Sequence, residues 1–235
     1  MDFNTIKLFC IPFSGGNAYS YAAFKKYLPE PVQLHNLELP GRGTRIAEPL
    51  LNSIDAMTED LYKQIENKTD GNYVLFGHSL GALLCLTLCR YLSQKGAKLP
   101  LMLFVSGQTA PSLIEPDDRY CLPDDQFINM LREMEGTPEE LLVDKSFIQY
   151  FLPIAKADFQ SIANYKYVAA KIPMKIPFVV LLGSQENISD EDASRWQLET
   201  EKQVSIHRFE GGHFFIFNQT EEVCMLIEKN INNLI

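Results

Sequence analysis

The chain has 235 residues, of which 46% are hydrophobic and 22% are charged, and its formal net charge is −9. This length and composition fit one sizeable α/β domain with a buried core, and the acidic balance argues against general nucleic-acid binding. We expect no signal peptide and no membrane span, because no stretch reaches the roughly 18 apolar residues that cross a bilayer.

Short apolar segments alternate with amphipathic ones along the chain. The expected strands are 6–11, 32–39, 73–76, 101–105, 178–182 and 204–209. The expected helices are 19–28, 54–66, 80–92, 190–199 and 219–231. Nearly continuous apolar strands with intervening helices are typical of a mostly parallel central sheet that carries helices on both faces.

The segment 110–173 interrupts this alternation, since it contains helical patterns and no good strand. Thr137 and Pro138 are typical of a helix start, with Thr137 at the N-cap and Pro138 in the first turn. We therefore expect a core of residues 1–109 and 174–235 and a helical lid insertion of residues 110–173. The alternative is a helical elaboration that packs only on the core.

Five cysteines stand at positions 10, 85, 89, 121 and 224, without a C-x-x-C pair. Cys85 and Cys89 share a predicted helix face, but no further ligands accompany them. The pattern favours buried thiols in a reducing cytoplasm over a metal site.

The segment Gly77 to Gly81 reads G-x-S-x-G and lies between a predicted strand and a predicted helix. A serine at such a turn adopts unfavourable backbone angles, which the flanking glycines permit, and this layout is typical of a nucleophile elbow. The alternative is a glycine-rich turn with an incidental serine. We predict that Ser79 is a nucleophile.

A serine hydroxyl needs a base to remove its proton, and four histidines are available. His78 should point away from the nucleophile, and His35 and His207 lie within strand patterns. His213 follows the last predicted strand, and loops at the carboxyl ends of parallel strands meet at the edge that holds Ser79. His213 is therefore the predicted general base.

The base needs a carboxylate partner, which should follow a strand between Ser79 and His213. Glu186 lies three residues after Gly183, in a loop that could reach His213. Asp190 follows a plausible N-cap, Ser189, where an acidic side chain is explained by the helix dipole. Glu186 is the predicted triad acid, and Asp190 is kept as the alternative.

Two glycine-containing turns follow predicted strands. The turn Pro12 to Gly16 follows the first strand, so the N–H groups of Phe13 and Leu80 are the predicted oxyanion donors. The turn Pro40 to Arg45 could cradle a phosphate but lacks P-loop spacing, which favours a structural turn with solvated arginines.

With these residues in place, the chain resembles the type II thioesterases of the α/β-hydrolase superfamily. The resemblance covers 11–16, 39–43, 76–81, 122–125, 151–153, Trp196 and 211–213. It implies an α/β-hydrolase fold and a Ser79–His213 pair with oxyanion donors at Phe13 and Leu80. Glu186 departs from the family, which usually has Asp at this point.

The resemblance also implies the reaction, which is hydrolysis of acyl groups from the phosphopantetheine arm of carrier proteins of nonribosomal peptide and polyketide synthetases. We expect no metal or redox cofactor, because phosphopantetheine arrives with the substrate. We further expect a monomer with carrier-protein domains as partners. The alternatives are a carboxylesterase of small esters, a chain-terminating fatty-acyl thioesterase, or a non-catalytic carrier-binding module.

Overall fold

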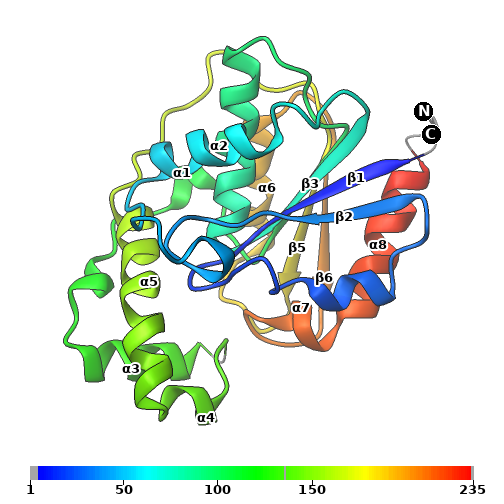
Figure 1. Ribbon diagram of the computed structural model, residues 1–235. Helices are drawn as coiled ribbons and strands as arrows, with labels where there is room; N and C mark the ends of the chain where they lie inside the picture. Colours follow the sequence, from blue (N-terminus) through cyan, green and yellow to red (C-terminus); the bar gives the residue numbers. More distant parts are fainter. Residues whose placement is uncertain (1–4, 135, 234–235) are drawn as a thin grey trace.

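The computed structural model describes residues 5–134 and 136–233 and places six strands in one fully parallel sheet (Figure 1). The strand order across the sheet is β2-β1-β3-β4-β5-β6. The strands are β1 (Ile6–Ile11), β2 (Val32–Asn36), β3 (Asn72–His78), β4 (Leu103–Ser106), β5 (Phe178–Gly183) and β6 (Val204–Phe209). Each return to the sheet is a crossover, as parallel pairing requires, and the α/β-hydrolase architecture is confirmed.

Helices cover both faces of the sheet (Figure 1). The helices on one face are α1 (Ile54–Ile65), α2 (Leu80–Gln94) and α6 (Asp190–Ser194), with the 3-10 turn Arg195–Glu199. The helices on the other face are α7 (Phe215–Asn218) and α8 (Thr220–Asn232), with the 3-10 turn Ala22–Lys26.

Alternation along each strand divides the core into two layers. In β1, Phe9 and Ile11 pack toward α1 and α2, whereas Leu8 and Cys10 pack toward α8. All four side chains are fully buried, which explains why the strand reads as a continuous apolar run rather than as alternating polar and apolar residues.

Most expected elements are present, and the three largest differences in extent concern β2 and two helices. Strand β2 ends at Asn36, three residues before the expected limit, although Leu37 and Leu39 remain buried. The expected helix 19–28 is only the short 3-10 turn Ala22–Lys26, and the expected helix 190–199 divides at Arg195 into an α and a 3-10 part.

The segment between β4 and β5 is helical, as expected. It contains α3 (Asp124–Glu133), α4 (Glu139–Leu142) and α5 (Lys145–Ala163), and the short 3-10 turns Pro111–Leu113 and Asp118–Cys121. These helices form a separate lobe beside the sheet (Figure 1) and share an apolar cluster that includes Phe127, Leu131 and Leu152. Helix α4 begins one residue later than predicted, so Pro138 rather than Thr137 is its N-cap. The division of the chain at 109/110 and 173/174 stays a prediction.

The turn after β2 is structural, but the prediction of solvated arginines is wrong for Arg42. The guanidinium of Arg42 is 1% exposed and forms a two-pronged ion pair with Asp158 of α5, at 2.6 and 2.8 Å. Arg45, in the 3-10 turn Gly43–Arg45, is partly exposed and pairs with Asp60 and Glu48. The glycines let the chain turn sharply enough to bring Arg42 beneath the lid, since Gly41 and Gly43 have positive φ angles.

Four of the five cysteines are buried free thiols, as predicted, whereas Cys121 is exposed. None of the helices in residues 5–134 and 136–233 is long and apolar enough to cross a membrane.

Candidate active site

Ser79 occupies a sharp turn between β3, which ends at His78, and α2, which begins at Leu80. Its backbone has φ 54° and ψ −119°, a positive φ that non-glycine residues rarely adopt. The Ser79 N–H donates a hydrogen bond of 2.7 Å to the carbonyl of Ser106 at the end of β4. The strained turn is thereby held to the sheet, and the predicted elbow geometry is present.

The two flanking glycines are required by direct backbone contact. A Cβ on Gly77 would lie 2.1 Å from the carbonyl oxygen of Gly81, inside van der Waals contact. A Cβ on Gly81 would lie 2.3 Å from the carbonyl oxygen of Ile11 and 2.9 Å from that of Pro12. The elbow therefore packs backbone to backbone against the end of β1.

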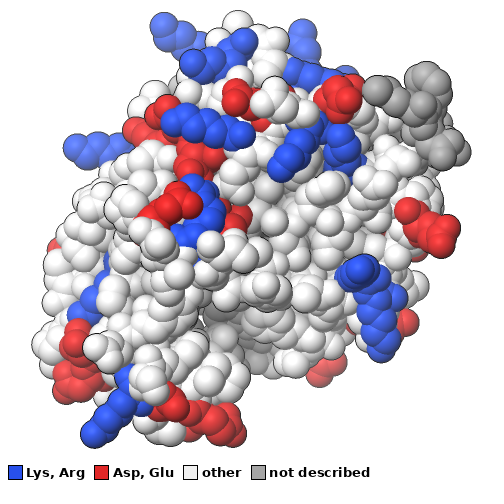
Figure 2. Space-filling model, in the orientation of Figure 1, with Lys and Arg blue, Asp and Glu red and all other residues white. Residues whose placement is uncertain are grey.

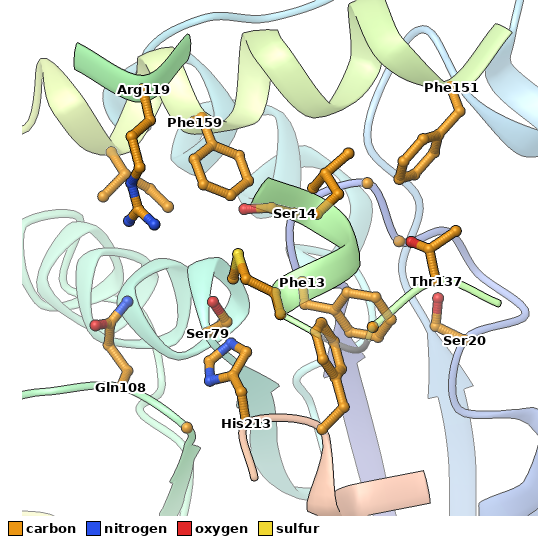
Figure 3. Close-up of a pocket in the computed structure, with 18 of the residues that line it drawn as sticks. Phe13, Ser14, Ser20, Ser79, Gln108, Arg119, Thr137, Phe151, Phe159 and His213 are labelled. Atoms are coloured by element: carbon orange, nitrogen blue, oxygen red, sulfur yellow. The ribbon is translucent and has the colours of Figure 1, made fainter. Parts of the chain in front are cut away.

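His213 and Glu186 meet at the carboxyl edge of the sheet, in the loops that follow β6 and β5. Nδ1 of His213 lies 2.7 Å from Oε1 of Glu186. Oε2 of Glu186 accepts a hydrogen bond of 2.7 Å from the backbone N–H of Gly183, so both carboxylate oxygens are engaged. The imidazole faces Ser79 across the cavity floor (Figure 3), and its Nε2 is buried without a hydrogen-bond partner in the described part of the chain.

Asp190, the alternative acid, lies elsewhere. It is in the first turn of α6, where Ser189 caps the helix as predicted. Its side chain is 80% exposed and pairs with Arg208 at 2.7 Å. The carboxylate that contacts His213 is therefore that of Glu186.

The other histidines have structural surroundings. The His78 ring is fully buried, its Nδ1 lies 2.9 Å from Oγ of Ser106, and its centroid is 4.8 Å from that of His213. Burial, with a smaller contribution from His213, holds the pKa of His78 well below its usual range, so the ring is neutral. His35 and His207 lie within β2 and β6.

The predicted oxyanion donors are free to bind a ligand. Within residues 5–134 and 136–233, the backbone N–H groups of Phe13 and Leu80 donate no hydrogen bond to the protein. The Leu80 N–H is the first of helix α2, where the unpaired amides carry partial positive charge. The Phe13 ring packs edge-on against Phe214, next to His213, with 5.1 Å between ring centroids.

A cavity of about 430 Å³ lies between the catalytic edge of the sheet and the lid. Ser79, His213 and Phe13 form its floor, and Phe151 and Phe159 point down into it from α5 (Figure 3). Polar side chains lie at both ends of the cavity, with Gln108 and Arg119 at one end and Ser20 and Thr137 at the other (Figure 3). The helical insertion therefore covers the site, as the lid interpretation predicted.

The lid lies close to the segments that carry Phe13 and His213. A Cβ on Gly136 would come within 2.0 Å of the Phe214 ring, and a Cβ on Gly15 would come within 2.5 Å of the Phe151 ring. The sequence analysis missed Asp158 of α5, whose carboxylate also accepts a hydrogen bond of 2.7 Å from the Gly15 N–H. No local pattern marks this residue, since its partners are more than a hundred positions away in the chain.

This arrangement supplies a hydroxyl, an imidazole oriented by a carboxylate, and two unpaired backbone donors, which together are the groups that acyl transfer requires. Among the described residues, no group of three or more His, Cys, Asp or Glu side chains is placed to hold a metal ion.

Among known proteins with similar sequences or structures are several thioesterases. Residues 6–231 match the family described as "Thioesterase domain". The chain is 32% identical over 228 residues to the "Gramicidin S biosynthesis protein GrsT" of Aneurinibacillus migulanus, covering 96% of this chain and 89% of that protein. Among solved structures, it is similar to ClbQ from the colibactin NRPS/PKS pathway, with a TM-score of 0.92, 31% identity and 98% coverage of both chains.

A second similar structure is the type II thioesterase BorB from the borrelidin biosynthetic cluster. Its TM-score is 0.88 at 27% identity, with 97% of this chain and 93% of that chain covered. The family match spans nearly the whole chain and agrees with the fold and with the serine elbow at the cavity floor. The chain belongs to the thioesterase domain family, and it is a thioester hydrolase.

Proposed function

We propose that the protein hydrolyses acyl or aminoacyl groups from the phosphopantetheine arm of carrier proteins, and so regenerates stalled or mis-primed nonribosomal peptide or polyketide synthetases. One observation carries this proposal. The Glu186–His213 pair, at 2.7 Å, faces Ser79 under a helical lid, in a chain similar over almost its whole length to GrsT, ClbQ and BorB.

In the proposed mechanism, His213 Nε2 takes the hydroxyl proton as Ser79 Oγ attacks the thioester carbonyl. Glu186 accepts a hydrogen bond from the Nδ1–H group of His213 and so stabilises the imidazolium ion. The N–H groups of Phe13 and Leu80 stabilise the oxyanion, and each such donor typically contributes ~3 kcal/mol to lowering the barrier. The carbon–sulfur bond then breaks, and the pantetheine thiol leaves with the proton from His213.

In the second half-reaction, His213 takes a proton from water as the water attacks the acyl-serine. The carbon–oxygen bond to Ser79 breaks, and the proton returns to Oγ, which releases the carboxylic acid. Neither half-reaction needs a metal or a redox cofactor. The uncharged side chains that surround most of the cavity, such as Phe159 and Leu131, keep water scarce around the charged imidazolium.

The proposed partners are acyl or peptidyl carrier domains. The net charge of −9 does not favour bulk attraction to acidic carriers, so docking would rely on local contacts. A hollow between the lid and the sheet domain is bordered mainly by uncharged residues (Figure 2). We also propose that the protein is a monomer in the cytoplasm, where a reducing environment suits its free thiols.

The test is an intact-mass assay on carrier proteins loaded with a panel of aminoacyl, short-acyl and long-acyl groups. Wild-type protein should release the acyl group, and Ser79→Ala should release none while still binding the carrier. Unchanged hydrolysis by Ser79→Ala would show that Ser79 is not the nucleophile.

Matched substrates separate the alternatives. Faster turnover of a simple ester than of the carrier-bound thioester would identify a carboxylesterase. Turnover restricted to long fatty-acyl carriers would identify a chain-terminating enzyme instead. Size-exclusion chromatography tests the proposed monomeric state, which elution at the size of a dimer would contradict.

A further inference from the structure

Lid helix α5 contacts the core through a buried carboxylate. Asp158 is fully buried, and its two oxygens accept hydrogen bonds from both terminal nitrogens of Arg42, at 2.6 and 2.8 Å. The same oxygen that binds Nη1 of Arg42 also accepts the Gly15 N–H at 2.7 Å. One carboxylate therefore joins the lid, the turn after β2 and the turn after β1.

The Gly15 amide belongs to the turn that presents the Phe13 N–H. Gly16 donates a hydrogen bond of 2.8 Å to the Phe13 carbonyl, which closes the turn Phe13–Gly16. Nη1 of Arg42 also donates to the carbonyl of Gly16, at 3.3 Å. The Asp158–Arg42 pair thus holds one N–H and one carbonyl within three residues of the Phe13 amide.

The turn has little intrinsic preference for this shape. Gly15 adopts a φ of +77°, and a glycine samples both signs of φ freely, so an unanchored Gly15-Gly16 pair would populate several conformations. Oxyanion donors are effective only when they are already aimed at the developing charge, and small displacements reduce the rate steeply. An external anchor is therefore needed, and the only side-chain bond to the Gly15 amide in residues 5–134 and 136–233 comes from Asp158.

We propose that Asp158 is a positioning residue for the hydrolytic reaction, which uses its hydrogen bond to Gly15 to hold the turn Phe13–Gly16 with the Phe13 N–H aimed at the oxyanion. The C-terminal half of α5 is then a fixed part of the active site as well as a cover. This inference rests on the proposed function, because it assigns a role to the oxyanion turn of that reaction.

The charge pair and the Gly15 hydrogen bond can be separated by two double variants. Arg42→Met with Asp158→Asn removes both charges but keeps a carbonyl oxygen that can accept the Gly15 N–H. Arg42→Met with Asp158→Leu also removes both charges and fills similar space, but offers no acceptor. Both avoid leaving an unpaired buried charge, which is the main risk of single substitutions here.

The Leu double variant should lose ~10- to 100-fold in kcat relative to the Asn double variant, because its oxyanion donor is misaimed. KM should agree within about threefold, since a donor used only in the transition state does not change ground-state binding. Equal kcat values in two folded double variants would overturn the proposal and leave the pair as a packing contact. If either double variant does not fold, Arg42→Gln with Asp158→Asn and Arg42→Gln with Asp158→Ala carry the same comparison, again without an unpaired buried charge.

A second measurement does not depend on hydrolysis. Hydrogen–deuterium exchange of a peptide spanning residues 12–16 should be at least ~10-fold faster in the Leu than in the Asn double variant, because Gly15 has lost its acceptor. Equal exchange would also overturn the proposal. If wild type and Ser79→Ala both prove inactive, the proposed function fails while the exchange result still decides the role of Asp158.

The matched control is Glu199→Gln. Glu199 is also a buried carboxylate, 1% exposed, and it pairs with Arg90 at 2.5 Å and accepts from the Tyr167 hydroxyl at 2.8 Å. It lies at the end of the 3-10 turn Arg195–Glu199, and it does not line the cavity. Its loss should lower the melting temperature but leave kcat and exchange at residues 12–16 unchanged.

Discussion

The Glu186 carboxylate holds the His213 ring from the loop next to it, with 2.7 Å between Oε1 and Nδ1, and is itself held by the Gly183 N–H. Glutamate is one methylene longer than the aspartate usual at this position in the family that the sequence resembles. The hydrogen bond from the Gly183 N–H folds the longer Glu186 side chain back over its own loop, so its carboxylate still lies against the His213 imidazole.

Replacing this carboxylate should severely impair catalysis. Glu186→Gln should lower kcat by ~10²- to 10⁴-fold, because the amide neither stabilises the imidazolium ion nor fixes the ring tautomer. The measurement is the kcat for release of an acyl group from a carrier protein. Asp190→Asn is the matched control, since that exposed carboxylate pairs with Arg208, and its kcat should stay within twofold, roughly the reproducibility of such rates. The reverse ranking would identify Asp190 as the acid.

The buried ring of His78 should make stability depend on pH. Its pKa is well below the unfolded value of about 6.5, so below that pH the unfolded chain takes up a proton that the folded protein does not. Stability is therefore full above about pH 7 and falls by up to ~1.4 kcal/mol per pH unit below pH 6.5. Urea unfolding of wild type and His78→Gln between pH 5 and 7 should show a shallower slope in the variant.

His207→Gln serves as the comparison for His78. Burial, and to a lesser extent Lys229, also lowers the pKa of His207, but the His207 ring is only partly buried whereas the His78 ring is fully buried. His207→Gln should therefore flatten the pH dependence of the free energy of unfolding less than His78→Gln does. A wild-type slope of zero between pH 5 and 6.5 would contradict the neutral, buried state of His78.

A single methyl group at Gly77 should destabilise the fold. The added Cβ of Gly77→Ala would lie 2.1 Å from the Gly81 carbonyl oxygen, and the nearest atoms all belong to the backbone of Gly81 and Ala82, which cannot give way cheaply. We expect a loss of at least ~2 kcal/mol in the free energy of unfolding, measured by urea denaturation. Gly71→Ala meets no atom within 4 Å and should change stability by less than ~0.5 kcal/mol. Similar values for the two would contradict the close approach at the elbow.

The lid side chains should set the acyl group that fits. Phe159→Leu replaces a ring that points into the cavity by a smaller side chain. The ratio of kcat/KM for longer acyl groups to kcat/KM for shorter ones should therefore rise, by at most ~10-fold for each methylene group that the enlarged cavity accommodates. Phe24→Leu makes the same change in the core layer beneath α8, away from the cavity, and should leave the ratio unchanged. An unchanged ratio in both would show that Phe159 does not limit the acyl chain.

The sheet and the elbow were predictable because their signals are local. The limits of β1 and β6 coincide with the expected strands Ile6–Ile11 and Val204–Phe209, in which apolar residues recur along the segment. The G-x-S-x-G spacing marks a turn that few other residues could form. The expected meeting of Glu186 with His213 also follows from topology, since both loops leave adjacent parallel strands at the same edge.

The largest error concerns a contact between distant segments, and two smaller ones are local. Arg42 looked solvated because a charged side chain in a glycine-rich turn is usually exposed, and its partner Asp158 lies 116 positions away. Cys121 looked buried because cysteines usually are, but it ends a 3-10 turn on the lid surface. The helix expected at 19–28 is reduced to the short 3-10 turn Ala22–Lys26, although Tyr21 and Phe24 are both buried as the apolar pattern indicated.

The close contact between Gly81 and the carbonyls of Ile11 and Pro12 has a consequence for how such an enzyme can change. The nucleophile and the segment leading to Phe13 touch through main chain alone, with no side chain between them whose size could be altered. Ordinary substitutions therefore cannot tune the spacing between the attacking oxygen and its oxyanion donor. Substitutions in the lid, in contrast, can change the shape of the cavity and with it acyl selectivity, while this main-chain contact stays as it is.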